Sequence, residues 1–203
     1  MAVSAQEVME LREKTGAGLM DCKRALVEAD GDQDKATVLL RERGIAKAEK
    51  KRARSANEGI IAHYVHADNK KGVLLELNCE TDFVARNEEF QNLAREICMQ
   101  IVAMDPIAVR REELPEEIVQ REKSIYAQQV QDKPDHVVEK IVEGKLEKFY
   151  EEACLLDQPY VRDNEKTIGA LVDELIAKLG EKIRVARFAR MEVGEQQEGD
   201  DEQ

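Results

Sequence analysis

The first part of the chain alternates apolar and polar residues with the period of an α-helix. Three such stretches are separated by glycine-containing turns: residues 4–14, 19–29 and 32–44. Ser4 and Glu7 match a capping box at the start of the first stretch, and Gly44 is placed to end the third. The pattern predicts a three-helix bundle over residues 1–45, of the kind used as a docking module.

Residues 58–193 combine strand and helix patterns. Two runs rich in β-branched residues, 59–67 and 73–79, flank a polar turn and predict an antiparallel hairpin. Apolar faces at helical spacing predict four helices: residues 87–104, 115–131, 135–154 and 167–179. We expect an α+β chain, in which the bundle precedes a core domain with a small antiparallel sheet packed against helices.

The predicted core closes with a loop, a helix and a strand. Residues 157–166 contain a proline and read as a loop before the last helix. Residues 183–193 read as the last strand, with these apolar residues on alternate positions: Ile183, Val185, Ala189, Met191 and Val193. The final residues, 194–203, are acidic and are expected to form a disordered tail.

Basic residues crowd the segment that joins the two parts. Residues 46–57 show little apolar periodicity and contain five basic side chains: Lys47, Lys50, Lys51, Arg52 and Arg54. Such a segment is either a nucleic-acid contact or a solvated, helical connector. No aromatic residues interleave the charges, and this favours a connector. We therefore expect a basic linker over residues 46–57.

Composition narrows the classes of function. The 203 residues carry a net charge of −12, which argues against direct nucleic-acid binding because that affinity is built largely from Lys and Arg. No apolar run is long enough to cross a membrane, and the N-terminus lacks the basic and apolar regions of a secretory signal. The 4 cysteines are scattered, as is typical of reduced thiols in the cytoplasm.

Catalytic chemistry finds little support in the sequence. His63 and His66 project to opposite faces of a predicted strand and cannot share a metal ion. His136 begins a predicted helix without cysteine or carboxylate ligands at metal spacing. Cys79 has no base near it in sequence and reads as a small core residue. We expect a binding protein with no metal site and no cofactor, rather than an enzyme.

One predicted turn carries an acid beside a large apolar ring. Asp82 and Phe83 lie within residues 78–87, between a predicted strand and a predicted helix. A turn cannot bury a phenylalanine by local packing alone. The ring therefore either folds back into its own core or is presented to another molecule, and the local pattern leaves both options open.

Two long motifs resemble the signatures of the elongation factor Ts family. The first is Leu-Arg-Glu-Lys-Thr-Gly-Ala-Gly-Leu-Met-Asp-Cys-Lys-Arg-Ala-Leu, over residues 11–26. The second is Glu-Leu-Asn-Cys-Glu-Thr-Asp-Phe-Val-Ala, over residues 76–85. The similarity continues through residues 142–145 to residues 190–194, so it covers nearly the whole chain.

The resemblance implies a guanine-nucleotide exchange factor for elongation factor Tu, the GTPase that delivers aminoacyl-tRNA to the ribosome. In this family the N-terminal bundle is ubiquitin-associated-like and docks on the GTPase domain of Tu. By resemblance, Arg12, Leu19 and Met20 lie in that contact. By resemblance, the last part of the family core touches a more distant domain of Tu.

The second signature is the exchange motif of the family, Thr-Asp-Phe-Val, carried here by residues Thr81, Asp82, Phe83 and Val84. By resemblance, Phe83 wedges into an apolar pocket of Tu beside the nucleotide. Asp82 helps to shift the elements of Tu that hold Mg²⁺. The metal ion belongs to the partner and is not a cofactor of this chain.

The chain length is similar to that of the short class of the family. Longer members carry a second sheet-containing subdomain and a coiled-coil insertion, and 203 residues leave no room for both. Members of the short class are expected to form homodimers, so that Tu touches both copies. Residues 183–193 contain no cysteine, so pairing through this strand would not be disulfide-linked.

Two other hypotheses compete with the exchange factor. A generic helical-bundle adaptor would explain residues 1–45 but gives Asp82 and Phe83 no task. An RNA-binding protein would use the basic residues 47–54. Its affinity would fall steeply with salt, because phosphate contacts release counterions.

Overall fold

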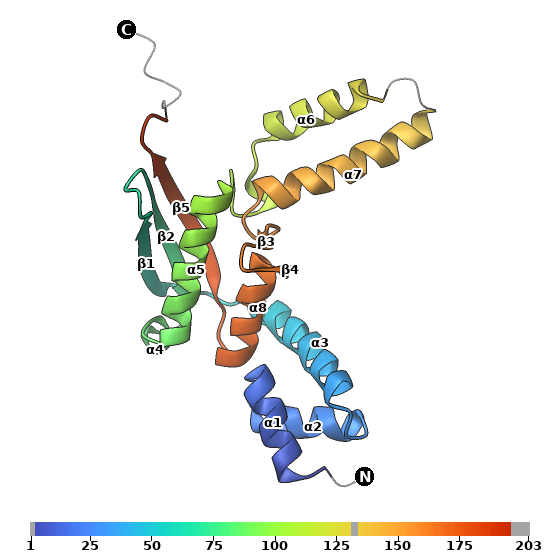
Figure 1. Cartoon of the computed structure of the whole chain (residues 1–203), viewed down its shortest axis with the longest axis vertical. Helices are drawn as coiled ribbons and strands as arrows, with labels where there is room; N and C mark the ends of the chain where they lie inside the picture. The colour runs from blue at the N-terminus through green and yellow to red at the C-terminus, as the bar shows by residue number, and fades with distance from the viewer. Residues whose placement is uncertain (1–2, 131–133, 196–203) are drawn as a thin grey trace. The chain divides into compact units, whose positions relative to one another are not determined.

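The computed structural model describes residues 3–130 and 134–195, and its elements are drawn in Figure 1. It confirms the expected α+β class. In chain order the elements are α1 (Ala5–Thr15), α2 (Leu19–Glu28), α3 (Gln33–Arg52), β1 (Glu58–Val65), β2 (Lys71–Cys79), α4 (Asp82–Ala85), α5 (Glu88–Met104), the 3₁₀ turn η1 (Arg111–Glu113), α6 (Glu116–Gln128), α7 (Asp135–Ala153), β3 (Pro159–Tyr160), β4 (Asp163–Thr167), α8 (Ile168–Leu179) and β5 (Arg184–Glu192).

The chain divides into two compact units, each built from several stretches of sequence. The first unit gathers Met1–Ile60, Asn78–Gln91 and Leu171–Arg184. The second unit gathers Ile61–Leu77, Asn92–Ala170 and Val185–Gln203. The expected acidic tail lies outside the described residues from residue 196 onward.

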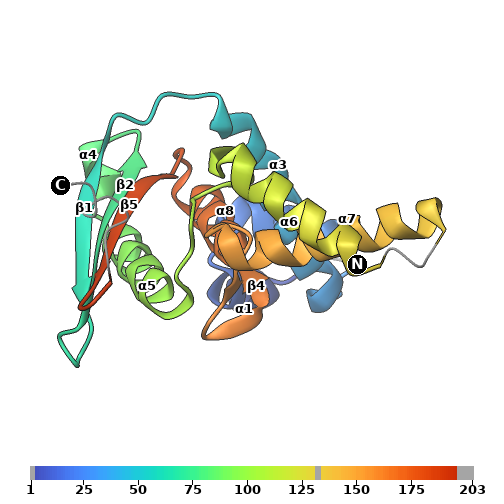
Figure 2. The same ribbon diagram turned by 90° about the horizontal axis from the view of Figure 1, so that it is seen from above.

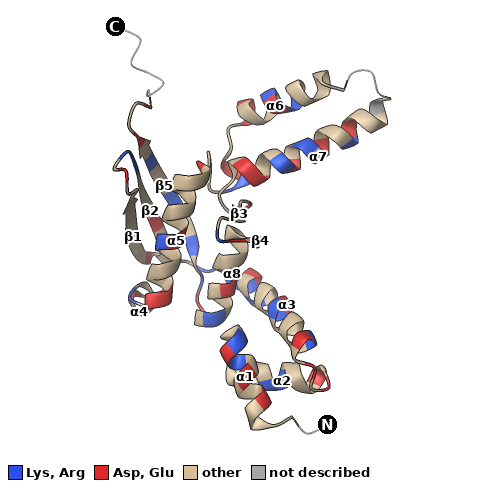
Figure 3. Ribbon diagram, in the orientation of Figure 1, with Lys and Arg blue, Asp and Glu red and all other residues tan. Residues whose placement is uncertain are grey.

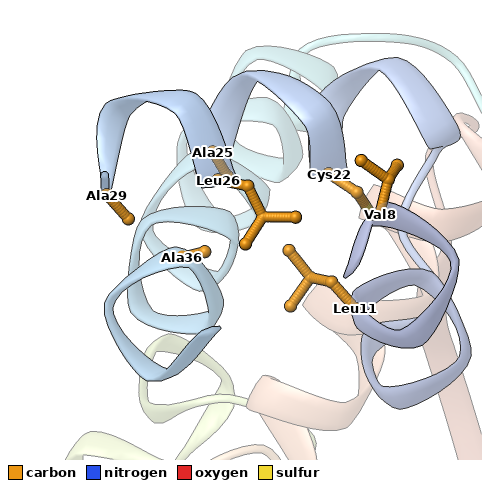
Figure 4. Packing of buried hydrophobic residues seen from close by; sticks show 7 residues of the cluster. All are labelled: Val8, Leu11, Cys22, Ala25, Leu26, Ala29 and Ala36. Carbon is orange, nitrogen blue, oxygen red and sulfur yellow. The ribbon is translucent and has the colours of Figure 1, made fainter. Parts of the chain in front are cut away.

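The predicted bundle is present in the first unit. Ser4 caps α1 as expected, because its hydroxyl accepts from Glu7 N at 3.2 Å and the Glu7 carboxylate accepts from Ser4 N at 2.7 Å. Gly16 then ends α1 in the left-handed conformation, with φ of 67°. Small residues let the helices pack closely around two leucines. The buried cluster, shown in Figure 4, consists of Val8, Leu11, Cys22, Ala25, Leu26, Ala29 and Ala36.

The third helix is longer than the sequence pattern predicted. Gly44 does not end it, because α3 continues to Arg52 and takes in much of the expected linker, residues 46–57. A Cβ atom at Gly44 would lie 3.2 Å from the side chain of Ala177 in α8. The glycine therefore permits a close approach between two helices of the first unit. Glycine suits this role as well as it suits a helix end, so the sequence pattern could not separate the two.

A three-stranded antiparallel sheet lies in the second unit, with strand order β1-β2-β5. The predicted hairpin of β1 and β2 is thereby confirmed. Helix α5 runs along one face of this sheet in Figure 1, and Figure 2 shows the same arrangement from above. The central strand β2 buries alternate residues, as expected of a face that a helix covers: Val73, Leu75 and Leu77.

The other face of the sheet is uncovered in the part of the chain that the structure describes. We call it the open sheet face, and its large exposed apolar side chains are Ile61, Val65, Leu74, Met191 and Val193. Strand β5 was expected to carry one apolar face, but only Ile183 and Val185 at its start are buried. Met191 and Val193 are each 73% exposed. Beyond Val185 the less exposed positions are instead Ala186, Phe188, Arg190 and Glu192, so the expected apolar face does not continue along the strand.

Helices α6 and α7 form a hairpin in the second unit, close to the two helices predicted over residues 115–131 and 135–154. Gln131, where the first was expected to end, lies outside the described residues. Arg111 fixes the base of the hairpin with ion pairs to Glu147 at 2.9 Å and to Asp157 at 2.8 Å. Its guanidinium group also stacks over Tyr150, 4.7 Å from the ring centroid.

The expected loop at residues 157–166 is wrong in part, because β3 and β4 pair there as a small antiparallel ladder. The buried amide of Gln100 in α5 holds this segment in place. It donates to the carbonyl oxygen of Pro159 at 3.1 Å and accepts from Val161 N at 3.0 Å. Backbone groups that a loop would expose to water are satisfied by a side chain about 60 residues earlier, and no local pattern reveals this.

Two glycines give a matched test of packing in the second unit. A Cβ atom at Gly169 would lie 2.9 Å from the carbonyl oxygen of Leu156, whereas the space around Gly144 in α7 is open. We expect Gly169→Ala to lower the free energy of unfolding by about 1–3 kcal/mol. Gly144→Ala should raise it by about 0.5–1 kcal/mol, because alanine favours a helix interior. Urea unfolding measures both, and a Gly169→Ala protein as stable as the parent would contradict the close contact.

Candidate functional site

Phe83 lies in water on a short helix. The expected turn is instead the single-turn helix α4, Asp82–Ala85. Phe83 is 83% exposed, whereas Val84 and Ala85 beside it are buried. The ring is therefore not folded back into its own core, which answers the question that the sequence left open. The helix is held by its buried residues and presents the ring outward.

The polar residues of α4 stabilise its N-terminal end. Thr81 is the N-cap, and its hydroxyl oxygen accepts from Val84 N at 3.5 Å. Asp82 lies in the first turn, where a negative charge interacts favourably with the helix dipole. Its carboxylate also pairs with Arg86 at 3.0 Å, with both side chains largely exposed. Exposed pairs of this kind are weak, so Asp82 can exchange Arg86 for another partner.

Glu80 anchors the chain directly before α4, a role that no local sequence pattern indicates. Its carboxylate accepts from the backbone N–H of Lys182 at 2.7 Å and pairs with Arg54 at 3.2 Å. The hydrogen bond from Lys182, and next the pairing with Arg54, hold the pKa of Glu80 below its ordinary value. Glu80 is thus a charged anchor at neutral pH rather than a proton donor.

Cys79 is a structural thiol beneath the same segment. It is fully buried, and its Sγ donates to the carbonyl oxygen of Thr81 at 3.1 Å. Burial, together with the negative charge of Glu181, raises the pKa of Cys79 to about 11. The thiol is therefore protonated at neutral pH and acts as a donor, as expected for a core cysteine and not for a nucleophile.

The three N-terminal candidate residues lie on the bundle. Arg12 is exposed in the last turn of α1. Leu19 and Met20 open α2 and are 46% and 63% exposed, respectively. The Gly16–Gly18 turn joins these two positions. The candidate residues thus form two surfaces on different elements, one on the bundle and one on α4.

The basic segment after the bundle makes contacts within the chain. Lys47 pairs with Asp21 at 2.7 Å, and Arg54 pairs with Glu80. Figure 3 shows that basic and acidic residues are interspersed along α3 rather than separated by sign. Since most of the expected linker is helical and two of its basic side chains are already paired, these contacts favour a connector over a phosphate-binding strip.

Residues 3–130 and 134–195 contain neither a cluster suited to a metal ion nor a membrane-spanning helix. Within these ranges, no group of three or more His, Cys, Asp and Glu side chains could hold a metal ion. No described helix is both long and apolar enough to cross a membrane. All 4 cysteines are buried and free.

The chain is similar to known proteins along nearly its full length. A profile of the family described as Elongation factor TS matches residues 34–195, which include α4. Elongation factor Ts of Thermotoga neapolitana is 57% identical over 196 residues, covering 97% of this chain and 100% of that protein. Elongation factor Ts of Thermodesulfovibrio yellowstonii is 57% identical over 199 residues, covering 98% and 100%. The protein of the same name from Caldanaerobacter subterraneus subsp. tengcongensis is 56% identical over 195 residues, covering 95% and 98%.

Proposed function

Because the chain belongs to the elongation factor Ts family, we propose that it is the guanine-nucleotide exchange factor of elongation factor Tu. It binds Tu that holds GDP, inserts residues 81–84 beside the nucleotide and promotes exchange of GDP for GTP. The observation that carries this proposal is the 83% exposure of Phe83 on a helix whose next two residues, Val84 and Ala85, are buried. A large apolar ring held in water on a fixed support is available for a pocket on another protein.

The proposed mechanism needs no bond chemistry. GDP on such a GTPase is held through phosphate contacts, partly through Mg²⁺. Phe83 enters an apolar pocket and Asp82 approaches the elements that hold the metal ion, so that α4 is incompatible with the metal-bound arrangement. GDP then leaves without having touched this chain. By thermodynamic reciprocity, a returning nucleotide weakens the binding of the factor by the same ratio, so the factor is released and acts again.

The wedge alone is too small to hold the complex together. Burying a phenylalanine contributes roughly 1.5–3 kcal/mol, or about ten- to a hundredfold in an equilibrium constant. The remaining affinity must come from broader surfaces. We assign part of it to the bundle, where Arg12, Leu19 and Met20 dock on the GTPase domain of Tu. The bundle binds equally well before and after GDP leaves, whereas α4 binds best after it has left.

The assignment extends to cellular location and to nucleic acid. We place the factor in the cytoplasm, where translation takes place, and cell fractionation with Tu as a marker tests this. We assign it no direct contact with nucleic acid, which the net charge of −12 and the ion pairs of Lys47 and Arg54 within the chain support. RNA retained on this protein with a steep salt dependence would contradict that assignment.

We expect Phe83→Ala to slow the release of GDP from Tu by about ten- to a hundredfold at saturating factor, because the wedge is lost. The melting temperature should stay unchanged, because the ring is exposed. Release of a fluorescent GDP from purified Tu measures the rate. Ile125→Ala is the control, since it removes an exposed apolar side chain from α6.

Two outcomes of this experiment would count against the wedge. A parent protein that does not accelerate GDP release at micromolar concentration would remove the proposed function altogether. A Phe83→Ala protein that exchanges as fast as the parent, or that unfolds, would show that the ring has a different task.

Met20→Ala should affect exchange in a different way. Docking through the bundle contributes equally to the states before and after GDP release, so its loss weakens binding without changing the maximal rate. We expect the factor concentration at half-maximal rate to rise about tenfold, as for a buried contact at the centre of an interface. A lower maximal rate at saturating factor would instead assign Met20 to the exchange step.

We also propose that two copies pair through the open sheet face. It exposes apolar side chains on all three strands, including Leu74 and Met191. An ion pair between Glu76 and Arg187, at 2.7 Å, lies on the same face as Leu74. A two-fold axis would bring apolar residues onto apolar residues and let each charged pair face its copy, as a self-complementary interface requires.

Met191→Asp should therefore convert dimers to monomers. A carboxylate within an apolar interface is strongly unfavourable, and we expect the dissociation constant to rise by at least about a hundredfold. Sedimentation equilibrium measures this, with Val161→Asp as a control that places the same charge at an exposed residue outside the sheet. A parent protein that is monomeric at all concentrations would refute the pairing.

A further inference from the structure

Two residues before α4 exchange hydrogen bonds with two residues after α8. Glu181 accepts from Thr81 N at 3.0 Å and from Thr81 Oγ1 at 2.7 Å. In the opposite direction, Lys182 N donates to Glu80 Oε1 at 2.7 Å. We call these four residues the clasp. Each side supplies one carboxylate and one backbone N–H, so two points fix one segment against the other.

Within the clasp, Glu181 orients the group that caps α4. A threonine hydroxyl has one hydrogen to donate, and that of Thr81 goes to Glu181 Oε1. The lone pairs of the hydroxyl oxygen are then free to accept from Val84 N, at 3.5 Å. A helix of one turn is far below the length at which helices are stable by themselves. Helix α4 therefore depends on this cap and on its buried residues.

The Glu181 side of the clasp is itself well supported. Gly180 ends α8 in the left-handed conformation, with φ of 77°, and its N–H donates to Ile176 O at 2.9 Å. Lys182 Nζ donates to the carbonyl oxygen of Arg54 at 2.6 Å, and Arg54 in turn pairs with Glu80. The residues on both sides of Glu181 thus have contacts of their own, apart from those of Glu181 to Thr81.

Phe83 has little packing of its own to define its position, since it is 83% exposed. Where the ring lies is decided by the backbone of α4, and the backbone is fixed at its start by the clasp. We propose that Glu181 is a positioning residue for exchange, which holds α4 so that Phe83 and Asp82 meet Tu already ordered. This inference rests on the proposed function. If α4 became ordered only on binding, the free-energy cost of ordering it would reduce its effect on GDP binding.

The first test needs no partner. The chain contains no tryptophan, so Phe83→Trp places a single indole at the exposed position. Time-resolved fluorescence anisotropy then reports how freely this side chain and its backbone move. Adding Glu181→Ala should increase the amplitude of the nanosecond local motion. Glu151→Ala is the matched control, because it removes the same charge from an exposed position on α7. Equal decays for the two variants would overturn the positioning role.

The second test separates positioning from docking. At saturating factor, we expect Glu181→Ala to lower the maximal rate of GDP release from Tu about tenfold, as small misplacements of reacting groups do. The concentration at half-maximal rate should change by less than about threefold, since the bundle is untouched. A change confined to the half-maximal concentration would overturn the proposal.

A double-mutant cycle shows whether Glu181 acts through the ring. In the Phe83→Ala background there is no wedge left to position, so Glu181→Ala should add little further loss. Independent, multiplying losses would overturn the proposal. If the parent protein fails to accelerate GDP release from Tu, the proposed function is refuted. The anisotropy result still decides whether Glu181 orders α4.

A conservative variant covers the case in which Glu181→Ala does not fold. Glu181→Gln keeps one oxygen for the N–H of Thr81 but turns the other acceptor into a donor, which forces the Thr81 hydroxyl to accept there. We expect local motion and maximal rate to lie between those of the parent and of Glu181→Ala. A Glu181→Gln protein identical to the parent in both measurements would contradict the role of the second acceptor.

Discussion

The hydrogen bonds exchanged between Glu80–Thr81 and Glu181–Lys182 decide where α4 lies, and α4 decides where Phe83 lies. A one-turn helix has no stability of its own, so its geometry is imposed by its surroundings. Its residues Val84 and Ala85 are buried, and the thiol of Cys79 donates to the carbonyl oxygen of Thr81, the N-cap. The result is a rigid support under a ring that faces water. Everything proposed for exchange depends on that support being formed before the partner arrives.

The proposed roles of the bundle and of α4 differ in whether each surface can distinguish the nucleotide states of Tu. The bundle presents Leu19 and Met20 on a preformed core, so it can add affinity without sensing the nucleotide. In the proposed mechanism, α4 is the surface that binds one nucleotide state of Tu better than another. A contact that is equal in all states cannot shift an equilibrium, however tight it is. Strong docking and a modest wedge together make a factor that binds firmly and is still displaced by nucleotide.

Local features of the fold were predictable from the sequence, whereas long-range features were not. The Ser4–Glu7 capping box and the buried stripe of α2 are encoded within a few residues of each other, and the structure has both. Gly44 was misread because a helix end and a close helix contact require the same small residue. The β3–β4 ladder was missed because Gln100, about 60 residues earlier, holds the segment through Pro159 and Val161. Contacts of this kind become visible only when the chain has folded.

In the candidate site, too, local features were predictable from the sequence and long-range contacts were not. The motif at Thr81–Val84 was recognisable by resemblance, and its exposed ring could be suspected from an apolar residue at a turn. Its supporting residues could not be recognised. Glu80 and Glu181 are two of 43 acidic residues in an acidic chain, and nothing in their immediate sequence distinguishes them. Their role depends on a hydrogen-bond partner about a hundred residues away.

That separation in sequence affects the order in which the chain folds during its synthesis. Thr81 and Glu181 are 100 residues apart, so a chain emerging from the ribosome exposes the docking bundle and the sequence of α4 long before Glu181 is synthesised. Closing a loop of this length carries a large entropic penalty and comes after local folding. Helix α4 therefore gains its final support only when synthesis is nearly complete. A truncated chain would carry the bundle without an ordered α4, so under the proposed function the ability to bind develops before the ability to exchange.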